Sequence, residues 1–324
     1  MPIFTFPHTQ TCRAIDWPEN LGKRCQQETG TCQPPTYIYT SFWYAAAKGC
    51  LCFRMDCPFR LCNSLRKTMV VEMQAAFDAY AVGLRPSIPP RRISTTDVAT
   101  RCNFSFAAFA HRGEHAYSCT ERLIPHPWAF GASSAHGNAS AAADHGNALP
   151  PPTRRRCAWG GSVGYHPLRG RLVQKMKNNS DLFEHLKTYV PMHRQAATYS
   201  CLIDVRGIGV SGRLPYLLSL GRPVLFVNRP RLWTWFTDPR FDDPLLPWVH
   251  VVPVADDLLN LEARAGWVLN ETFSATDMAR RAVLYARRNF ARGAMHRYLF
   301  KQLFPGRHTG QQQAARIASA KPGM

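Results

Sequence analysis

The residues best suited to chemistry follow one apolar segment in the second half of the chain. The segment C-L-I-D-V at residues 201–205 is followed closely by Arg206, Gly207, Ser211 and Arg213. Glycine permits a tight turn that exposes backbone N–H groups, while a hydroxyl and two guanidinium groups add donors and positive charge. Such donors bind phosphate or diphosphate groups. The spacing therefore indicates an anion site of the type that holds nucleotides.

Strands and a helix are expected around these residues. Residues 201–205 and 223–227 are short apolar runs, which is typical of buried strands. Ser211 and Arg213 stand where a helix is expected to begin between the two runs. Strand, glycine turn, helix and strand form the unit with which a doubly wound α/β domain binds a diphosphate.

The motifs over residues 199–258 resemble those of glycosyltransferase family 90, the lipopolysaccharide-modifying and protein O-glucosyltransferase family. That family shows a strand, G-x-x-x-S-x-R, a short helix, G-x-x-V-L and then P-W-V-H-x-x-P-V-x-x-D-L. An isolated G-x-x-x-S-x-R would favour an ordinary turn, but here the later positions match in order as well. They are Gly221, Val224, Leu225, Pro247, Trp248, His250, Pro253, Val254 and Asp257.

The resemblance implies a GT-B-like α/β fold with two facing Rossmann-like domains, the C-terminal one holding the nucleotide sugar. We divide the chain into a cysteine-rich region at 1–90 without clear correspondence, and an N-terminal acceptor-side Rossmann-like domain at 91–195 with a mobile loop at 131–153. A C-terminal nucleotide-sugar-binding domain at 196–305 and a polar tail at 306–324 follow. The class usually requires no metal, and the chain has no Asp-x-Asp motif, so we expect no cofactor.

The resemblance also implies roles for individual residues. In the family, the serine and arginine that correspond to Ser211 and Arg213 contact the nucleotide diphosphate, and we place Arg206 and Gly207 beside them. An upstream family pattern is an aromatic residue, Arg-Gly-Ser and later an arginine that opens a helix. The positions that fit are Trp159, Gly161, Ser162 and Arg169 or Arg171.

Gly160 departs from this pattern, because the family usually has an arginine there that is associated with the nucleotide-sugar site. Arg154, Arg155 and Arg156 are candidate substitutes. The departure keeps open a catalytically inactive relative that binds a glycan or a nucleotide.

Two further assignments have alternatives. The family's general base is an aspartate shortly before a P-x-F-S-F-like segment, which places Asp97 in that role, with an exposed turn residue as the alternative. His250 shares one strand face with Trp248 in an alternating pattern. It lies either near the sugar or base of the donor or in a packed strand with a structural role.

Composition sets the outer bounds. The chain has 324 residues, 45% hydrophobic residues and a formal net charge of +19, which argues against a wholly disordered protein and suggests polyanionic partners. Its cations are spread along the chain, and no nucleic-acid-binding motif accompanies them, so we expect no specific nucleic-acid partner. A basic polyanion-binding protein remains the third alternative.

Cysteines concentrate near the start. Seven of the eleven precede residue 63, which favours a disulfide-stapled cap over a zinc site at residues 50–62. Sequons begin at Asn103, Asn138, Asn178 and Asn270. We therefore expect the secretory pathway, the lumen of the endoplasmic reticulum or Golgi, although no signal peptide and no transmembrane segment is visible.

Together these features predict an inverting glycosyltransferase that moves glucose or xylose from a UDP-sugar to a hydroxyl of a protein Ser/Thr or of a polysaccharide. Arg206, Ser211 and Arg213 would stabilise the departing UDP, and Asp97 would take the acceptor proton.

Overall fold

A computed structural model describes residues 3–5, 41–47, 50–55, 64–81, 88–94, 106–107, 109–111, 122–125, 129, 150–207, 211–228, 232–238 and 241–304. The chain divides into two compact units. One unit comprises residues 1–110, 114–127 and 293–324, and the other comprises residues 111–113 and 128–292.

The second unit is built on a five-stranded sheet in the order β13-β11-β10-β8-β9, and every neighbouring pair in it is parallel. Taken in chain order from β8, this is the doubly wound 2-1-3-4-5 arrangement. The chain leaves β8 for β9 on one side and returns to β10 on the other, so its direction of travel reverses between β8 and β10. The strands are β8 (Arg154–Gly160), β9 (Phe183–Leu186), β10 (Tyr199–Asp204), β11 (Val224–Val227) and β13 (Val252–Val254).

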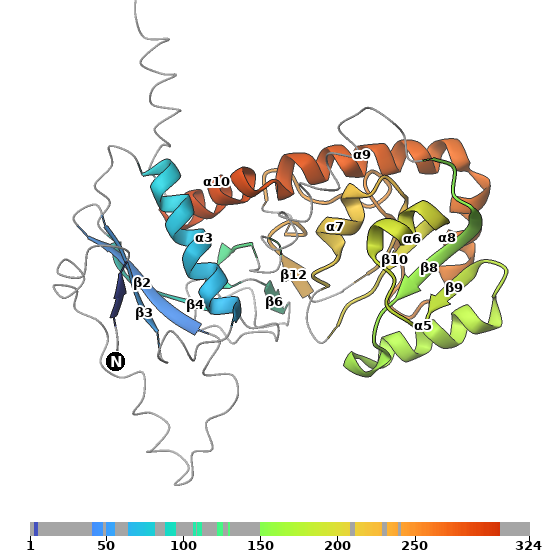
Figure 1. Ribbon diagram of the computed structural model, residues 1–324, viewed down its shortest axis with the longest axis horizontal. Helices are drawn as coiled ribbons and strands as arrows, with labels where there is room; N and C mark the ends of the chain where they lie inside the picture. Colours follow the sequence, from blue (N-terminus) through green and yellow to red (C-terminus); the bar gives the residue numbers. More distant parts are fainter. Residues whose placement is uncertain are drawn as a thin grey trace, which may run out of the picture. The chain divides into compact units, whose positions relative to one another are not determined.

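Helices pack on the two faces of this sheet (Figure 1). Alternate strand residues such as Cys157, Trp159, Ile203 and Leu225 share one core with α5 and α8, because side chains in a strand alternate between the two faces. The connections α6 and α7 contact β10. The helices are η5 (Val163–Tyr165), α5 (Pro167–Asn178), α6 (Met192–Thr198), α7 (Leu214–Ser219), α8 (Leu261–Asn270) and α9 (Thr272–Phe290).

The first unit contains a mixed sheet in the order β1-β3-β2-β4-β5-β7, in which β1, β3, β2 and β4 pair antiparallel and β4, β5 and β7 pair parallel. The expected second Rossmann-like sheet is thus not seen among the described strands. The elements are β1 (Ile3–Thr5), β2 (Ser41–Ala47), β3 (Cys50–Met55), β4 (Ile88–Ser94), β5 (Phe106–Ala107), β7 (Arg122–Leu123), α3 (Ser64–Tyr80) and α10 (Arg292–Leu303). Two short strands, β6 (Phe109–His111) and β12 (Leu232–Thr234), lie outside both sheets.

The helices α3 and α10 are held together by a buried polar pair. The His296 ring and the Glu72 carboxylate approach to 2.6 Å, and both side chains are buried. The Tyr80 hydroxyl also donates to the Gly293 carbonyl oxygen at 3.0 Å. The last described helix of the chain therefore packs with the first unit.

The boundary expected between residues 195 and 196 falls inside the five-stranded sheet. Strands β8 and β9 precede it, and strands β10, β11 and β13 follow it, yet all five are hydrogen-bonded into one sheet. The sequence hides this because β8 begins with Arg154, Arg155 and Arg156, which obscure the apolar second half of the strand. The expected loop at 131–153 and the tail at 306–324 lie almost entirely outside the described residues.

Two stretches whose apolar spacing predicts one helix each are divided in the structure. The pattern over residues 168–186 predicts a helix, but α5 ends at Asn178 and β9 follows. The pattern over residues 277–303 predicts one long helix, but α9 ends at Phe290 and α10 begins at Arg292, because Ala291 between them has a non-helical ψ of 137°.

Cys157 and Cys201 form a disulfide within the parallel sheet. They are register partners on β8 and β10, and both are fully buried. The sequence interpretation placed disulfides in the cysteine-rich region, where Cys12, Cys25, Cys32, Cys57 and Cys62 lie outside the described residues.

The disulfide predicts a measurable contribution to stability. It closes a loop with a sequence separation of 44 residues, for which unfolded-chain entropy gives about 4 kcal/mol. Cys201→Ala should lose stability of this order in urea unfolding, and reductant should destabilise the wild type more than it destabilises the variant. Free thiols at both positions in protein purified without reductant would contradict the assignment.

Candidate functional site

The residues expected to bind the diphosphate meet at the carboxyl ends of β8 and β10. Gly160 ends β8, and Asp204 ends β10. These strands are neighbours, and the chain reverses its direction of travel between them. In open parallel sheets, ligands bind in the crevice at this point. The topology therefore brings Trp159–Ser162 to the same place as Arg206, Gly207 and residues 211–213.

Ser211 is held by a carboxylate that the sequence interpretation did not single out. Its hydroxyl donates to Asp204 Oδ1 at 2.5 Å, and its oxygen accepts the Arg213 backbone N–H at 3.4 Å. Asp204 is fully buried, and Ser211 is 6% exposed. The sequence does contain a signal for this role, namely an aspartate at the end of an apolar strand. A carboxylate buried there needs hydrogen-bond partners nearby.

Arg213 connects the two strand ends. It is the N-cap residue of α7, and its Nη1 donates to the carbonyl oxygen of Gly160. Its guanidinium lies 5.8 Å from the centre of the Trp159 ring, within the range of a cation–π interaction. Arg213 as a whole is partly exposed, although its Nη2 atom is buried.

Arg169 makes a second connection from the first turn of α5. Its Nε donates to the Arg206 carbonyl oxygen at 2.8 Å, and its Nη1 donates to the Ser162 carbonyl oxygen at 2.9 Å. The side chain is 9% exposed. Arg171 is exposed on the same helix. Of the two alternatives left by the sequence, Arg169 is the one whose side chain joins the backbone at Ser162 to that at Arg206.

The Trp159 indole ring lies close to the guanidinium groups of both Arg169 and Arg213. It is fully buried, stacks on His185 at 5.6 Å and has the Arg169 guanidinium 5.7 Å from its ring centre. A Cβ atom on Gly161 would lie 3.0 Å from Trp159 Cζ2. Glycine at position 161 therefore lets the backbone pass directly over the ring.

The electrostatic field at this edge is positive. His166 is the N-cap of α5, and its Nδ1 accepts the Leu168 N–H at 3.2 Å. Burial lowers the pKa of His166, and the charges of Arg206, Arg169 and Arg171 lower it further. The Arg206 Nε donates to the Gly207 carbonyl oxygen at 3.3 Å. Residues 208–210, which hold the expected N–H groups after Gly207, lie outside the described residues.

Gly160 leaves little room for a larger side chain. A Cβ there would lie 3.3 Å from Leu186 Cβ and 3.6 Å from Gln195 Nε2. The side chain that the family resemblance leads one to expect would thus start against β9 and α6, whereas the Gly160 carbonyl oxygen faces Arg213.

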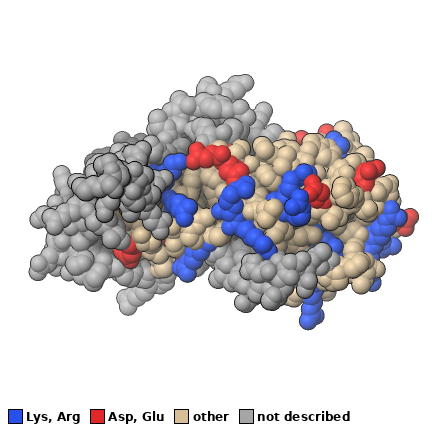
Figure 2. Space-filling view, turned by 90° about the horizontal axis from the view of Figure 1, so that it is seen from above, with Lys and Arg blue, Asp and Glu red and all other residues tan. Residues whose placement is uncertain are grey.

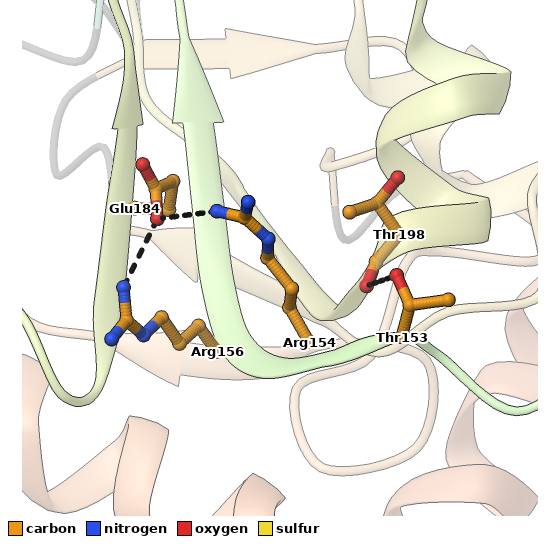
Figure 3. Close-up of polar contacts among 5 residues, drawn as sticks. All are labelled: Thr153, Arg154, Arg156, Glu184 and Thr198. Atoms are coloured by element: carbon orange, nitrogen blue, oxygen red, sulfur yellow. Dashed lines mark hydrogen bonds and ion pairs between the residues drawn. The ribbon is translucent and has the colours of Figure 1, made fainter.

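Arg154, Arg155 and Arg156 do not replace the missing arginine, because they lie at the opposite end of β8. Arg154 and Arg156 both pair with Glu184, at 3.4 and 3.1 Å (Figure 3). The Arg155 Nη2 donates to the Leu269 carbonyl oxygen at 2.8 Å. Gly160 stands four positions beyond Arg156 along the strand, which is roughly 13 Å.

His250 lies away from these residues, because it precedes β13 and so stands at the amino edge of the sheet. It is 7% exposed, its Nδ1 accepts the Leu246 N–H at 3.0 Å, and its ring packs on Tyr285 at 4.5 Å. Burial lowers its pKa. The prediction that His250 and Trp248 lie on one face of a strand is wrong. Trp248 is 41% exposed, has a φ of 63° and packs on Trp267.

Asp97, expected as the general base, lies outside the described residues. No group of three or more His, Cys, Asp or Glu side chains that could hold a metal ion occurs within the described ranges. The helices in those same ranges include none that is long and apolar enough to cross a membrane.

The fold and this edge define a doubly wound α/β unit with several arginines at its switch point, the place where open parallel sheets bind their ligands. Residues 165–305 match the model of glycosyl transferase family 90, which confirms the resemblance for this part of the chain. The match begins after β8, so Trp159, Gly160 and Ser162 lie before it. No curated protein matches the chain.

Gly161→Ala should destabilise the protein. The added methyl group would press on Trp159, and overpacking of this kind costs about 1–3 kcal/mol. Gly170→Ala is the matched control, because nothing lies within 4 Å of its Cβ position on α5. It should gain about 0.5–1 kcal/mol. Equal changes for the two variants in urea unfolding would contradict the packing argument.

His166→Asn should flatten the dependence of stability on pH. The pKa of His166 is lowered in the folded state. As the pH falls below about 6.5, the unfolded chain therefore binds a proton more readily than the folded protein does, and the folded protein loses stability. Above that pH the histidine is neutral in both states and does not change the stability. Asparagine keeps a capping oxygen without this titration. The fall in melting temperature from about pH 7.5 to about pH 5.5 should be smaller in the variant. Parallel curves for variant and wild type would refute it.

Proposed function

We propose that the protein is an inverting glycosyltransferase that transfers glucose or xylose from a UDP-sugar to a hydroxyl of a protein Ser/Thr or of a polysaccharide. One observation carries the proposal: Arg169, Arg206 and Arg213 gather at the switch point of a parallel sheet within a family 90 region. A diphosphate leaving group gains negative charge in the transition state, and fixed guanidinium groups stabilise that charge.

In this proposal Arg213 contacts the departing UDP, since it is less buried than Arg169. Both side chains also donate to backbone carbonyl oxygens, Arg213 to that of Gly160 and Arg169 to those of Ser162 and Arg206. Asp97 remains the proposed general base, and no metal takes part. The acceptor is a hydroxyl compound that the described residues do not identify. The buried disulfide supports an oxidising compartment, so we propose the lumen of the endoplasmic reticulum or Golgi as the location.

The departure at Gly160 favours a second candidate, a relative that binds the nucleotide sugar without transferring it. A basic polyanion-binding protein finds less support. Figure 2 shows lysines and arginines spread over the described surface with acidic residues among them. Several of the arginines are paired, for example Arg281 with Asp277 and Arg288 with Asp243.

Arg213→Ala tests the donor site. Binding of UDP-glucose and UDP-xylose by calorimetry should weaken about 10-fold or more, and slow UDP release should fall about 100-fold. Arg154→Ala removes the same charge at the far end of β8, and it should change neither quantity. Binding without UDP release in the wild type would favour the inactive relative. Equal losses in both variants, or no binding by folded wild type, would contradict the transferase.

A further inference from the structure

We propose that Tyr189 is the residue on which the uracil base of the nucleotide stacks. The inference rests on the proposed function, because it names a further residue of the same donor site. The arginines at the ends of β8 and β10 are cations and suit the diphosphate. A nucleobase instead presents a flat aromatic face, which binds by stacking on an aromatic side chain.

Tyr189 lies just beyond the carboxyl end of β9. Leu186 ends β9, and it is the register partner of Gly160, which ends β8. Tyr189 follows Leu186 by three positions, so its loop leaves the sheet beside the strand end whose carbonyl oxygen accepts the Arg213 guanidinium. The tyrosine therefore belongs to the edge at which open parallel sheets bind their ligands.

The loop that carries Tyr189 is fixed to the sheet by Gln195. The Nε2 atom of this buried side chain donates to the Val190 carbonyl oxygen at 2.6 Å. The same atom lies 3.6 Å from the position of a Cβ atom at Gly160. A hydrogen bond one residue after Tyr189 thus holds its backbone close to the end of β8. Because the loop is already ordered, less entropy is lost when a ligand binds to it.

Tyr216 relates Tyr189 to the arginine of the site. Tyr216 lies on α7 three positions after Arg213, and residues at this spacing are neighbours on a helix surface. Burial raises the pKa of the Tyr216 phenol, and the electrostatic interaction with Tyr189 raises it further. The two tyrosines are therefore close together, and Tyr189 lies on the side of α7 that also carries Arg213.

The Tyr189 ring is available to a ligand. Tyr189 is 90% exposed, whereas Trp159 at the same edge is fully buried, and Tyr216 is partly buried. A base can thus reach the ring of Tyr189 without any rearrangement of the core. Stacking would cover an aromatic face that otherwise stands in water, and this burial is favourable.

Calorimetry with UDP and with inorganic pyrophosphate tests the assignment in the full chain. Tyr189→Ala should weaken UDP binding about 10-fold, because the stacking of the base on the ring is lost. It should leave pyrophosphate binding unchanged, because pyrophosphate has anionic groups like those of UDP but no base. Tyr189→Phe keeps the ring without the hydroxyl, so its UDP affinity should stay within about 3-fold of the wild type.

Phe273→Ala is the matched control. Phe273 is also an exposed aromatic residue, at 87%, and it lies in the first turn of α9. That turn follows the end of α8, where the Leu269 carbonyl oxygen accepts from Arg155 near the start of β8. The control residue thus lies toward the amino edge of the sheet, and its removal should not change UDP affinity.

Three outcomes overturn the inference alone. The first is wild-type UDP affinity in Tyr189→Ala, or a loss no larger than that in Phe273→Ala. The second is an equal loss of UDP and pyrophosphate binding in Tyr189→Ala, because the residue would then act on the diphosphate. The third is a loss in Tyr189→Phe as large as that in Tyr189→Ala, because the hydroxyl and not the ring would then matter. Folded wild-type protein that binds neither ligand would instead contradict the proposed function itself.

Discussion

The parallel pairing of β8 with β10 is the constraint on which the site depends. Leu202 pairs with Ala158, and Cys201 pairs with Cys157, so the two strands end side by side. Residues that lie more than forty positions apart in the sequence meet there, because the chain runs to β9 and back before it forms β10. A shift of either strand by one residue would turn its side chains to the other face, so that Trp159 or Ile203 would leave the core they share. The position of the arginines is therefore set by the packing of the sheet.

Arg169 and Arg213 bring positive charge to the ends of these two strands. Hydrogen bonds to backbone carbonyl oxygens offset the free-energy cost of burying that charge. Burying a guanidinium is unfavourable unless its N–H groups are paired. Arg169 pairs with the Ser162 and Arg206 carbonyl oxygens, and Arg213 pairs with that of Gly160. Both also lie over the Trp159 ring. The positive charge is thus fixed before a ligand arrives, which is the arrangement that electrostatic stabilisation of a leaving group requires.

The sequence predicted the central part of this unit well. Strands β10 and β11 and the short helix between them carry apolar runs and a glycine turn, which are local signals. The strand β8 was missed because its arginines pair with Glu184 and α8 across the sheet, which no local pattern reveals. Asp204 was also not singled out, because its partner Ser211 stands seven positions further along the chain. His250 was placed near the site because motif order does not show which edge of a sheet a residue occupies.

Hydrogen–deuterium exchange with and without UDP tests most directly whether the switch point between β8 and β10 holds the nucleotide. Peptides that contain Gly160–Ser162 and those that contain Ser211–Arg213 should both gain protection. Peptides at the amino edge of the sheet, around Arg154 and His250, should be unchanged. Protection confined to the amino edge, or absent from either strand end at saturating UDP, would contradict the account.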